Sequence, residues 1–343
     1  MGYNNDGDIT GALGFGDTWV VKLSSTGIIQ WQKSLGGSAT DQGFAISLTN
    51  DGGYILTGFT YSNDIDVSGN HGGADIWVTK IDAVGSVGWQ KTLGGTLDDK
   101  GMQIQQTTDL GYIIVGNSSS TNGDVTGNHG GDDFWVIKLN TVGAIQWEQS
   151  YGGTNAEAAK NIKQTLDGGY IVSGYSSSNN GDVSGNKGAS DYWLLKIDNL
   201  GFIEWQKMLG GTNTDIGGVA LPTLDGGYIQ IGNSSSNNID VSGNHGSADC
   251  WVVKLNVLSD VSTIRKNHEL LIFPNPNNGK FAFINILEAS TIEIYDISGK
   301  IIFQSTTKDP SLTIDLSENS KGLYFYKVTT EKNQIQTGRL VVN

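Results

Sequence analysis

Asp75-Ile76-Trp77-Val78-Thr79-Lys80-Ile81 is the stretch of the 343-residue chain that decides the fold, because it returns at a fixed interval. Its tryptophan has counterparts 58 residues away on both sides, and a second series with the same interval starts at Trp31. The two series contain all nine tryptophans: Trp19, Trp77, Trp135, Trp193 and Trp251, then Trp31, Trp89, Trp147 and Trp205. No insertion or deletion interrupts four units. The array is therefore expected to span residues 17–248, with an extra strand at 249–256.

Each unit contains four short runs rich in Val, Ile, Trp and Tyr, which in the first unit are residues 18–23, 28–34, 43–49 and 54–60. Their length and composition are typical of β-strands, and none shows a helical period. Asn50-Asp51-Gly52-Gly53 predicts a tight turn that joins the last two strands as a hairpin. Four strands cannot bury both faces alone, so the units must stack. The sequence predicts an all-β protein with a β-propeller over residues 1–256, and an open stack of sheets is the alternative.

Composition and charge narrow the class of protein. Glycine accounts for 49 residues and the hydrophobic share is 37%, as expected of short strands joined by many turns. Residues 1–256 hold 26 acidic and 12 basic side chains, whereas 257–343 hold nine of each. An acidic surface without a basic cluster repels nucleic acid and anionic membranes. No run approaches the roughly 20 apolar residues of a membrane span. The single cysteine, Cys250, takes a strand position and cannot form an intrachain disulfide.

The repeat pattern stops after Leu255, and residues 257–269 read as a linker. Residues 270–343 contain six or seven short predicted strands, which suggests a small immunoglobulin-like β-sandwich. The segment Asp296 to Lys300 is expected to be a hairpin turn. Four short motifs follow one another in this region: Phe273-Pro274-Asn275-Pro276 with Gly279, Tyr295-Asp296-Ile297-Ser298-Gly299-Lys300, Gly322-Leu323-Tyr324, and Gly338-Arg339-Leu340-Val341-Val342.

These motifs give the segment its family resemblance. It resembles the type A C-terminal sorting domain of the type IX secretion system of Gram-negative bacteria. The resemblance implies export to the periplasm, recognition by the outer-membrane translocon, and removal of the tail with attachment to surface lipopolysaccharide or release. The chain opens in mid-repeat and has no apolar leader, so we expect a natural N-terminus farther upstream and an open arc or imperfect ring.

Two function classes remain open. The repeats look like the Trp- and Gly-rich propeller repeats common in proteins with this tail, and that favours a secreted or surface module that binds polysaccharide, protein or cells without catalysis. The alternative is a polysaccharide lyase or glycosidase that uses paired carboxylates near the propeller axis. The recurring candidates for such a pair are Asp41, Asp99, Glu157 and Asp215. A residue present in every blade is more typical of a structural role, since an active site needs asymmetry.

Other side chains also recur at fixed places. His71, His129 and His245 share one repeat position with Lys187 and Leu13, which favours a polar loop tip over a shared metal site. Trp19 shares a strand face with apolar residues, so packing between blades is expected rather than stacking on sugars. The opposite face carries a lysine in each unit, and we expect these lysines to pair with recurring aspartates: Lys22, Lys80, Lys138, Lys196 and Lys254.

The loops between units have the spacing of a calcium site. Asp64-x-Asp66-x-Ser68-Gly69 places oxygen ligands at positions 1, 3 and 5, with Asp75 at position 12. Asx turns without a metal are the alternative explanation. Four further loops have the same frame: Asp6, Asp8, Thr10 and Asp17; Asn122, Asp124, Thr126 and Asp133; Asn180, Asp182, Ser184 and Asp191; Asn238, Asp240, Ser242 and Asp249. The sequence predicts weak calcium binding there, because three of the loops begin with a neutral asparagine.

Overall fold

The computed structural model describes residues 9–256, 271–273, 279–284, 286, 289–331 and 335–342. The chain divides into two compact units, Met1–Thr263 and Ile264–Asn343. Every regular element in the described ranges is a β-strand, which confirms the all-β prediction.

Three antiparallel four-stranded sheets form the centre of the first unit, and within each sheet neighbours in sequence are neighbours in space. The strands of the first sheet are β3 (Asp41–Leu48), β4 (Tyr54–Thr60), β5 (Asp75–Ile81) and β6 (Val87–Leu93). Those of the second are β7 (Asp99–Gln106), β8 (Tyr112–Ser118), β9 (Asp133–Leu139) and β10 (Ile145–Tyr151). Those of the third are β11 (Glu157–Gln164), β12 (Tyr170–Ser176), β13 (Asp191–Ile197) and β14 (Ile203–Leu209).

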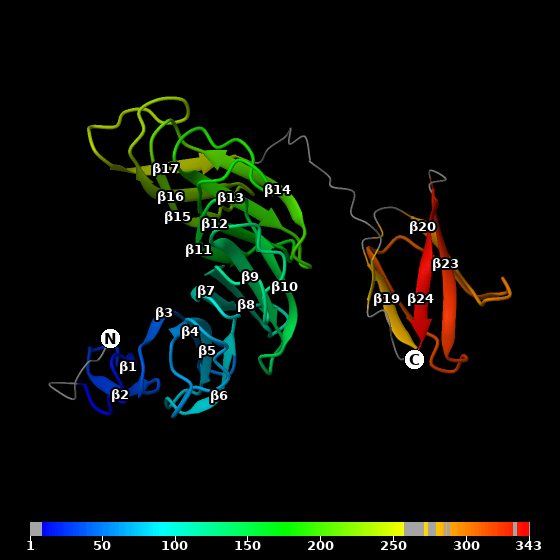
Figure 1. Cartoon of the computed structure of the whole chain (residues 1–343), viewed down its shortest axis with the longest axis horizontal. Coiled ribbons are helices and arrows are strands. Elements are labelled where there is room, and N and C mark those ends of the chain that lie inside the picture. Colours follow the sequence, from blue (N-terminus) through cyan, green and yellow to red (C-terminus); the bar gives the residue numbers. More distant parts are fainter. Residues whose placement is uncertain are drawn as a thin grey trace. The chain divides into compact units, whose positions relative to one another are not determined.

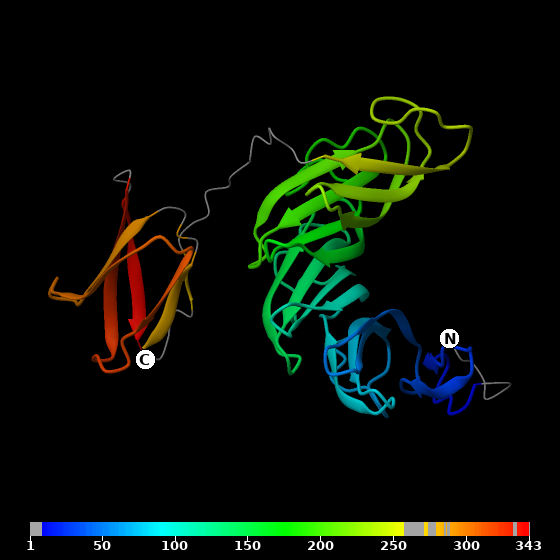
Figure 2. The ribbon, with the colours of Figure 1, turned by 180° about the vertical axis from the view of Figure 1, so that it is seen from behind.

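Smaller sheets stand at both ends of this series. One contains β1 (Thr18–Leu23) and β2 (Ile29–Leu35), and the other contains β15 (Asp215–Pro222), β16 (Tyr228–Ser234) and β17 (Asp249–Leu255). The first strands of successive sheets pack against one another, as expected of propeller blades around an axis. Figures 1 and 2 show that the sheets form an open arc, so the ring is not closed.

The sheets are offset by two strands from the predicted blades. The prediction of four complete blades over residues 17–248, with a new blade starting at 249, was wrong. Only three sheets in the described residues have four strands, and β17 is the third strand of the last sheet. The cause is the long loop 61–74, which returns the chain to the same sheet and pairs Thr60 with Asp75. The chain passes between sheets through the short Gly-Gly link instead. The predicted hairpin is confirmed, since Leu48 pairs with Tyr54.

The cores lie between successive sheets. Trp135 and Trp193 are fully buried, and the ring of Phe134 lies 4.7 Å from that of Trp193. The second tryptophan series packs across the junctions: the Trp89 ring lies 5.7 Å from Tyr112 in an edge-on arrangement. Core packing between blades, as predicted for these tryptophans, is therefore confirmed.

The second unit is a sandwich of two antiparallel sheets. One contains β18 (Leu271–Phe273), β19 (Lys280–Ile284) and β22 (Ser311–Asp315). The other has the order β21 (Ile301–Thr307), β20 (Ser290–Tyr295), β23 (Gly322–Thr330) and β24 (Ile335–Val342). Side chains from both sheets fill the core between them, among them Phe283, Ile292, Ile294 and Leu340.

Candidate functional site

The carboxylates proposed as an axial catalytic pair are buried beside the Gly-Gly links. Asp99 has no exposed surface, and its Oδ2 accepts hydrogen bonds from the Gly95 N–H and the Ser120 hydroxyl, both at 2.8 Å. Its Oδ1 accepts one from Ser118. Each carboxylate thus holds the link and a serine loop in place, which is a structural task. The same pattern of bonds recurs at Asp41, Glu157 and Asp215.

A second buried carboxylate lies beside each of these. Asp75 accepts hydrogen bonds on Oδ2 from the His71 N–H at 2.9 Å, whereas its buried Oδ1 has no partner. A Cβ placed on Gly94 would lie 2.9 Å from this Oδ1 and 2.6 Å from Oδ2 of Asp99, so both carboxylates crowd one glycine. Burial raises the pKa of both. Burial also raises the pKa of the equivalent Asp133 to about 6.

The predicted calcium ligands take separate partners. Asp64 accepts a hydrogen bond from the Ser38 N–H at 2.8 Å, and the Ser68 carbonyl accepts one from the Thr92 hydroxyl at 3.0 Å, while Asp75 bonds His71. Throughout the described ranges, no three His, Cys, Asp or Glu side chains are grouped so as to hold a metal ion. Calcium binding stays a prediction. Two members of the first loop lie outside the described residues: Asp6 and Asp8.

Each recurring histidine contacts the aspartate four residues further along the chain. The recurring lysines pair with aspartates as predicted except Lys22, whose ammonium donates a hydrogen bond to the Ala83 carbonyl at 3.3 Å. His129 Nδ1 lies 2.8 Å from Asp133, and its Nε2 lies 3.6 Å from Asp182 of the next sheet. At the following junction Lys187 contacts Asp240. The lysines of the opposite strand face pair with the hairpin aspartates: Lys80 with Asp51 at 2.8 Å, Lys138 with Asp109 at 2.9 Å, Lys196 with Asp167 at 3.0 Å, and Lys254 with Asp225 at 2.7 Å.

Sequence reasoning missed a groove between the first two complete sheets. Its volume is about 470 Å³, and polar groups from both sheets line it together with the turn that precedes β10. The lining includes Ser68, His71, Lys91, Leu93, Asp124 and Gly143. The sequence shows one related difference: this repeat position holds leucine at Leu35, Leu93 and Leu209 but the larger tyrosine at Tyr151.

The next junction shows what that difference does. Tyr151 is buried there, and its hydroxyl donates a hydrogen bond to the Gly201 carbonyl, the counterpart of Gly143. His129 reaches Asp182 across the same junction. Larger side chains and a cross-sheet contact therefore occupy the space that corresponds to the groove.

The sorting motifs come together in the second unit. Tyr324 and Leu340 are buried in its core, and Asp296 accepts hydrogen bonds from Ser298 and Lys300 in the predicted turn. Gly279, Gly299 and Gly322 have positive φ. Val341 is half-buried on β24, and Phe273 lies on β18. The remaining motif residues lie outside the described ranges: Pro274, Asn275 and Pro276.

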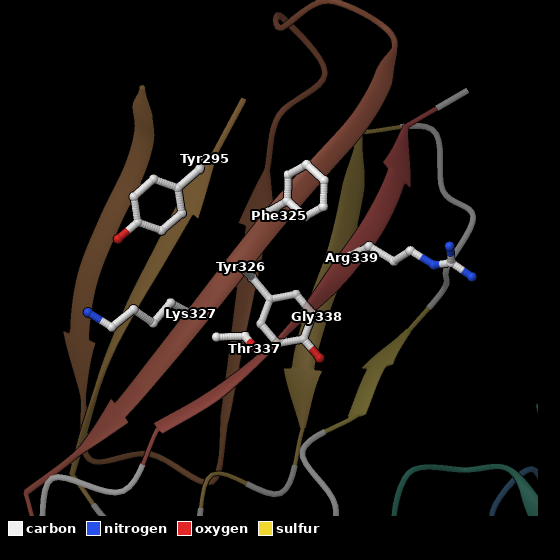
Figure 3. A pocket seen from close by; sticks show the side chains of 7 residues that line it. All are labelled: Tyr295, Phe325, Tyr326, Lys327, Thr337, Gly338 and Arg339. Atoms are coloured by element: carbon white, nitrogen blue, oxygen red, sulfur yellow. The ribbon is translucent and has the colours of Figure 1, made fainter. Parts of the chain in front are cut away.

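A groove of about 570 Å³ lies on the sheet that carries three of these motifs. Figure 3 shows Tyr295, Phe325 and Tyr326 along it, with the charged ends of Lys327 and Arg339 on opposite sides. Gly338 also lines the groove, and a Cβ on it would lie 2.5 Å from the Tyr326 ring. Only glycine fits that position without a shift of the ring.

Comparisons with known proteins agree with the resemblance of the tail. Residues 271–343 match the model of the secretion system C-terminal sorting domain. The ulvan lyase NLR42 of Nonlabens ulvanivorans is 27% identical over 74 residues, which are 21% of this chain and 14% of the lyase. The match thus spans far less than two thirds of that relative.

No helix in the described residues is long and apolar enough to cross a membrane.

Two solved structures are similar at a coarse level. PorZ of Porphyromonas gingivalis, described as an essential bacterial surface component of the type IX secretion system, has 9% identity and a TM-score of 0.30, over 96% of this chain and 43% of PorZ. A Bombyx mori GH32 β-fructofuranosidase has 12% identity and a TM-score of 0.34, over 91% of this chain and 78% of the enzyme. At these TM-scores neither structure bears on the activity of this chain.

Proposed function

We propose that the repeat sheets form a non-catalytic binding module for polysaccharide, in a chain whose type IX sorting domain takes it outside the cell or to the outer-membrane surface. The observation that supports this proposal is the polar groove between the sheets β3–β6 and β7–β10. At the next junction Tyr151 and the contact between His129 and Asp182 occupy the corresponding space, so the two junctions are not equivalent.

The lining of the groove matches the chemistry of sugar hydroxyls. A hydroxyl both donates and accepts hydrogen bonds, so a site for it needs donors and acceptors together. Lys91 supplies an exposed ammonium donor, His71 a ring partly exposed beside it, and Asp124 a half-buried carboxylate acceptor. A strongly anionic polymer is disfavoured, because Asp124 would repel it and the repeat unit is acidic overall.

No specific observation favours the alternative of a lyase or glycosidase. The carboxylates that such an enzyme would use are fully buried, and serine and glycine donors already occupy their oxygen atoms. A polymer chain would reach them only after the sheet junction opened.

The proposal predicts that the full chain binds polysaccharide through this groove. We expect Lys91→Ala and Leu93→Tyr each to weaken binding about tenfold or more, the first by removing a donor and the second by filling the space as Tyr151 does. Binding is measured by calorimetry with the strongest member of a panel of neutral, carboxylated and sulfated polysaccharides. Release of reducing ends is followed in the same samples.

Lys207→Ala is the matched control, because Lys207 holds the same repeat position as Lys91 and is also exposed, but lies beside the junction that Lys187 and Asp240 bridge. It should bind like the unmodified chain. Equal binding by Leu93→Tyr, or no binding to any member of the panel, would show the proposal to be wrong. Steady release of reducing ends would establish catalysis instead.

A further inference from the structure

The sorting domain has an exposed row of side chains that its core does not account for. Tyr295 pairs with Phe325 across β20 and β23, and Phe325 pairs with Arg339 across β23 and β24. Side chains of directly paired residues in antiparallel strands lie on the same face. The three therefore form a continuous row over three strands, and all three line the groove shown in Figure 3.

The other face of the same strands explains the buried motif residues. Tyr324 and Leu340 alternate with Phe325 and Arg339 along their strands and are buried in the sandwich core. Phe325, by contrast, is 45% exposed, and Leu323 on the same face is 39% exposed. Burial gives Tyr324 and Leu340 a reason to be apolar. Burial in the core does not explain why residue 325 is aromatic, because the Phe325 side chain is exposed and lies beside an exposed arginine.

Lys327 and Arg339 place their positively charged groups on opposite sides of this row. Glu293 is the acidic neighbour of the row; it accepts a hydrogen bond from the Tyr295 hydroxyl at 3.0 Å and lies 3.3 Å from the Lys327 ammonium. Its charge is thus balanced locally by Lys327. The Arg339 guanidinium adds a positive charge on the far side of the rings, as Figure 3 shows.

We propose that this aromatic and basic face, formed by Tyr295, Phe325, Lys327 and Arg339, is the surface by which the secretion machinery recognises the domain. The partner that fits it presents an acidic side chain next to an apolar one. A planar guanidinium beside an aromatic ring binds a carboxylate and an apolar group together, and Tyr, Phe and Arg are enriched at protein interfaces. The proposal rests on the sorting role of residues 271–343. It is independent of the polysaccharide site.

The test compares surface display of full-chain variants expressed behind a host signal peptide in a bacterium with a type IX system. We expect Phe325→Ala and Arg339→Glu each to lower the displayed fraction about tenfold or more, with protein accumulating in the periplasm and an unchanged melting temperature of the purified chain. Arg339→Lys should retain part of the display, because it keeps the charge without the planar fork.

Ile335→Ala and Lys308→Glu are the matched controls, since both residues are exposed on the same domain and lie outside the groove. Both variants should be displayed normally. Normal display of Phe325→Ala and Arg339→Glu, or loss of display by the controls to the same extent, would overturn the proposed face. Deletion of residues 264–343 tests the sorting role separately from the face. Surface display of the truncated chain would overturn the sorting role itself. If the truncated chain stays in the periplasm while the face variants are displayed normally, only the proposed face is overturned.

Discussion

At the scale of single residues, the buried carboxyls beside the Gly-Gly links couple stability to pH. Asp133 has no exposed surface, one of its oxygen atoms has no partner, and Glu157 lies beside it. Burial raises its pKa to about 6. A carboxyl with a raised pKa binds its proton more tightly in the folded chain than in the unfolded one. Its contribution to stability is therefore present at low pH and is lost as the pH rises through about 6.

Asp133→Asn should remove this loss, because the amide is neutral at every pH and has nearly the same shape. We compare the free energy of unfolding of the variant with that of the unmodified chain at each pH. This difference should be more favourable to the variant at about pH 8 than at about pH 4.5, by on the order of 1–3 kcal/mol. Urea unfolding at the two pH values measures it.

Asp249→Asn is the control for that measurement. Asp249 has the same repeat position, but its side chain is 37% exposed and hydrogen bonds from the His245 N–H and ring lower its pKa. Its substitution should give no gain at the higher pH. An equal gain for both variants would contradict the assignment of the effect to buried carboxyls.

Residue types and spacing predicted the lysine–aspartate pairs within a sheet and the packing of tryptophans between sheets, but not the contacts that differ from one junction to the next. Pairing of Lys80 with Asp51 follows from the alternation of strand faces and was expected. The groove is open because Leu93 is smaller than Tyr151, which holds the same repeat position at the next junction. This difference in size is informative only when residue 93 is known to face the following sheet. The unpartnered oxygen of Asp75 likewise depends on how closely Asp99 approaches it.

At the scale of strands and turns, tryptophans of the outermost strands lock successive sheets together over glycine turns. Gly143 has a φ of +79°, and a Cβ on it would lie 2.9 Å from the Trp89 ring of the preceding sheet. Gly85 and Gly201 lie similarly close to Trp31 and Trp147. The turn between the third and fourth strands is therefore part of each junction.

Gly143→Ala should destabilise the repeat unit by about 2–4 kcal/mol, since a methyl group there meets the indole and the backbone is strained as well. Gly168→Ala isolates the contribution of the backbone, because Gly168 has a φ of +87° and nothing within 4 Å of a Cβ. That control should cost only about 1 kcal/mol. Chemical unfolding compares them, and equal losses would show that the contact with Trp89 adds nothing.

The four-strand grouping was predicted correctly and its starting point was not. A cyclic repeat has no intrinsic beginning, so the pattern alone does not say which loop leaves a sheet. The long glycine-rich loop 61–74 looked like a connection between blades, yet Asn70 inside it donates a hydrogen bond to the Thr60 carbonyl at 3.0 Å and keeps the chain at its own sheet. The shorter link at Gly94-Gly95 is the true crossing, held by Asp99.

At the scale of the whole molecule, the two units have separate hydrophobic cores. Units with separate cores unfold separately unless a large interface joins them. We expect two calorimetric transitions for the full chain, and removal of residues 264–343 should leave the transition of the repeat unit within about 2 °C of its original temperature. A single transition that shifts on truncation would contradict this independence.

The offset between sequence repeat and sheet has a consequence for the gene. Each sheet meets its neighbours through the same glycine and carboxylate junction, so an in-frame loss or duplication of one 58-residue repeat joins surfaces that already match. Slippage between the similar DNA repeats would thus change the number of sheets in the array, and every new junction would join the same kinds of surface as the existing junctions. Alleles from related strains should differ by whole repeats, and insertions of any other length should be confined to exposed loop tips.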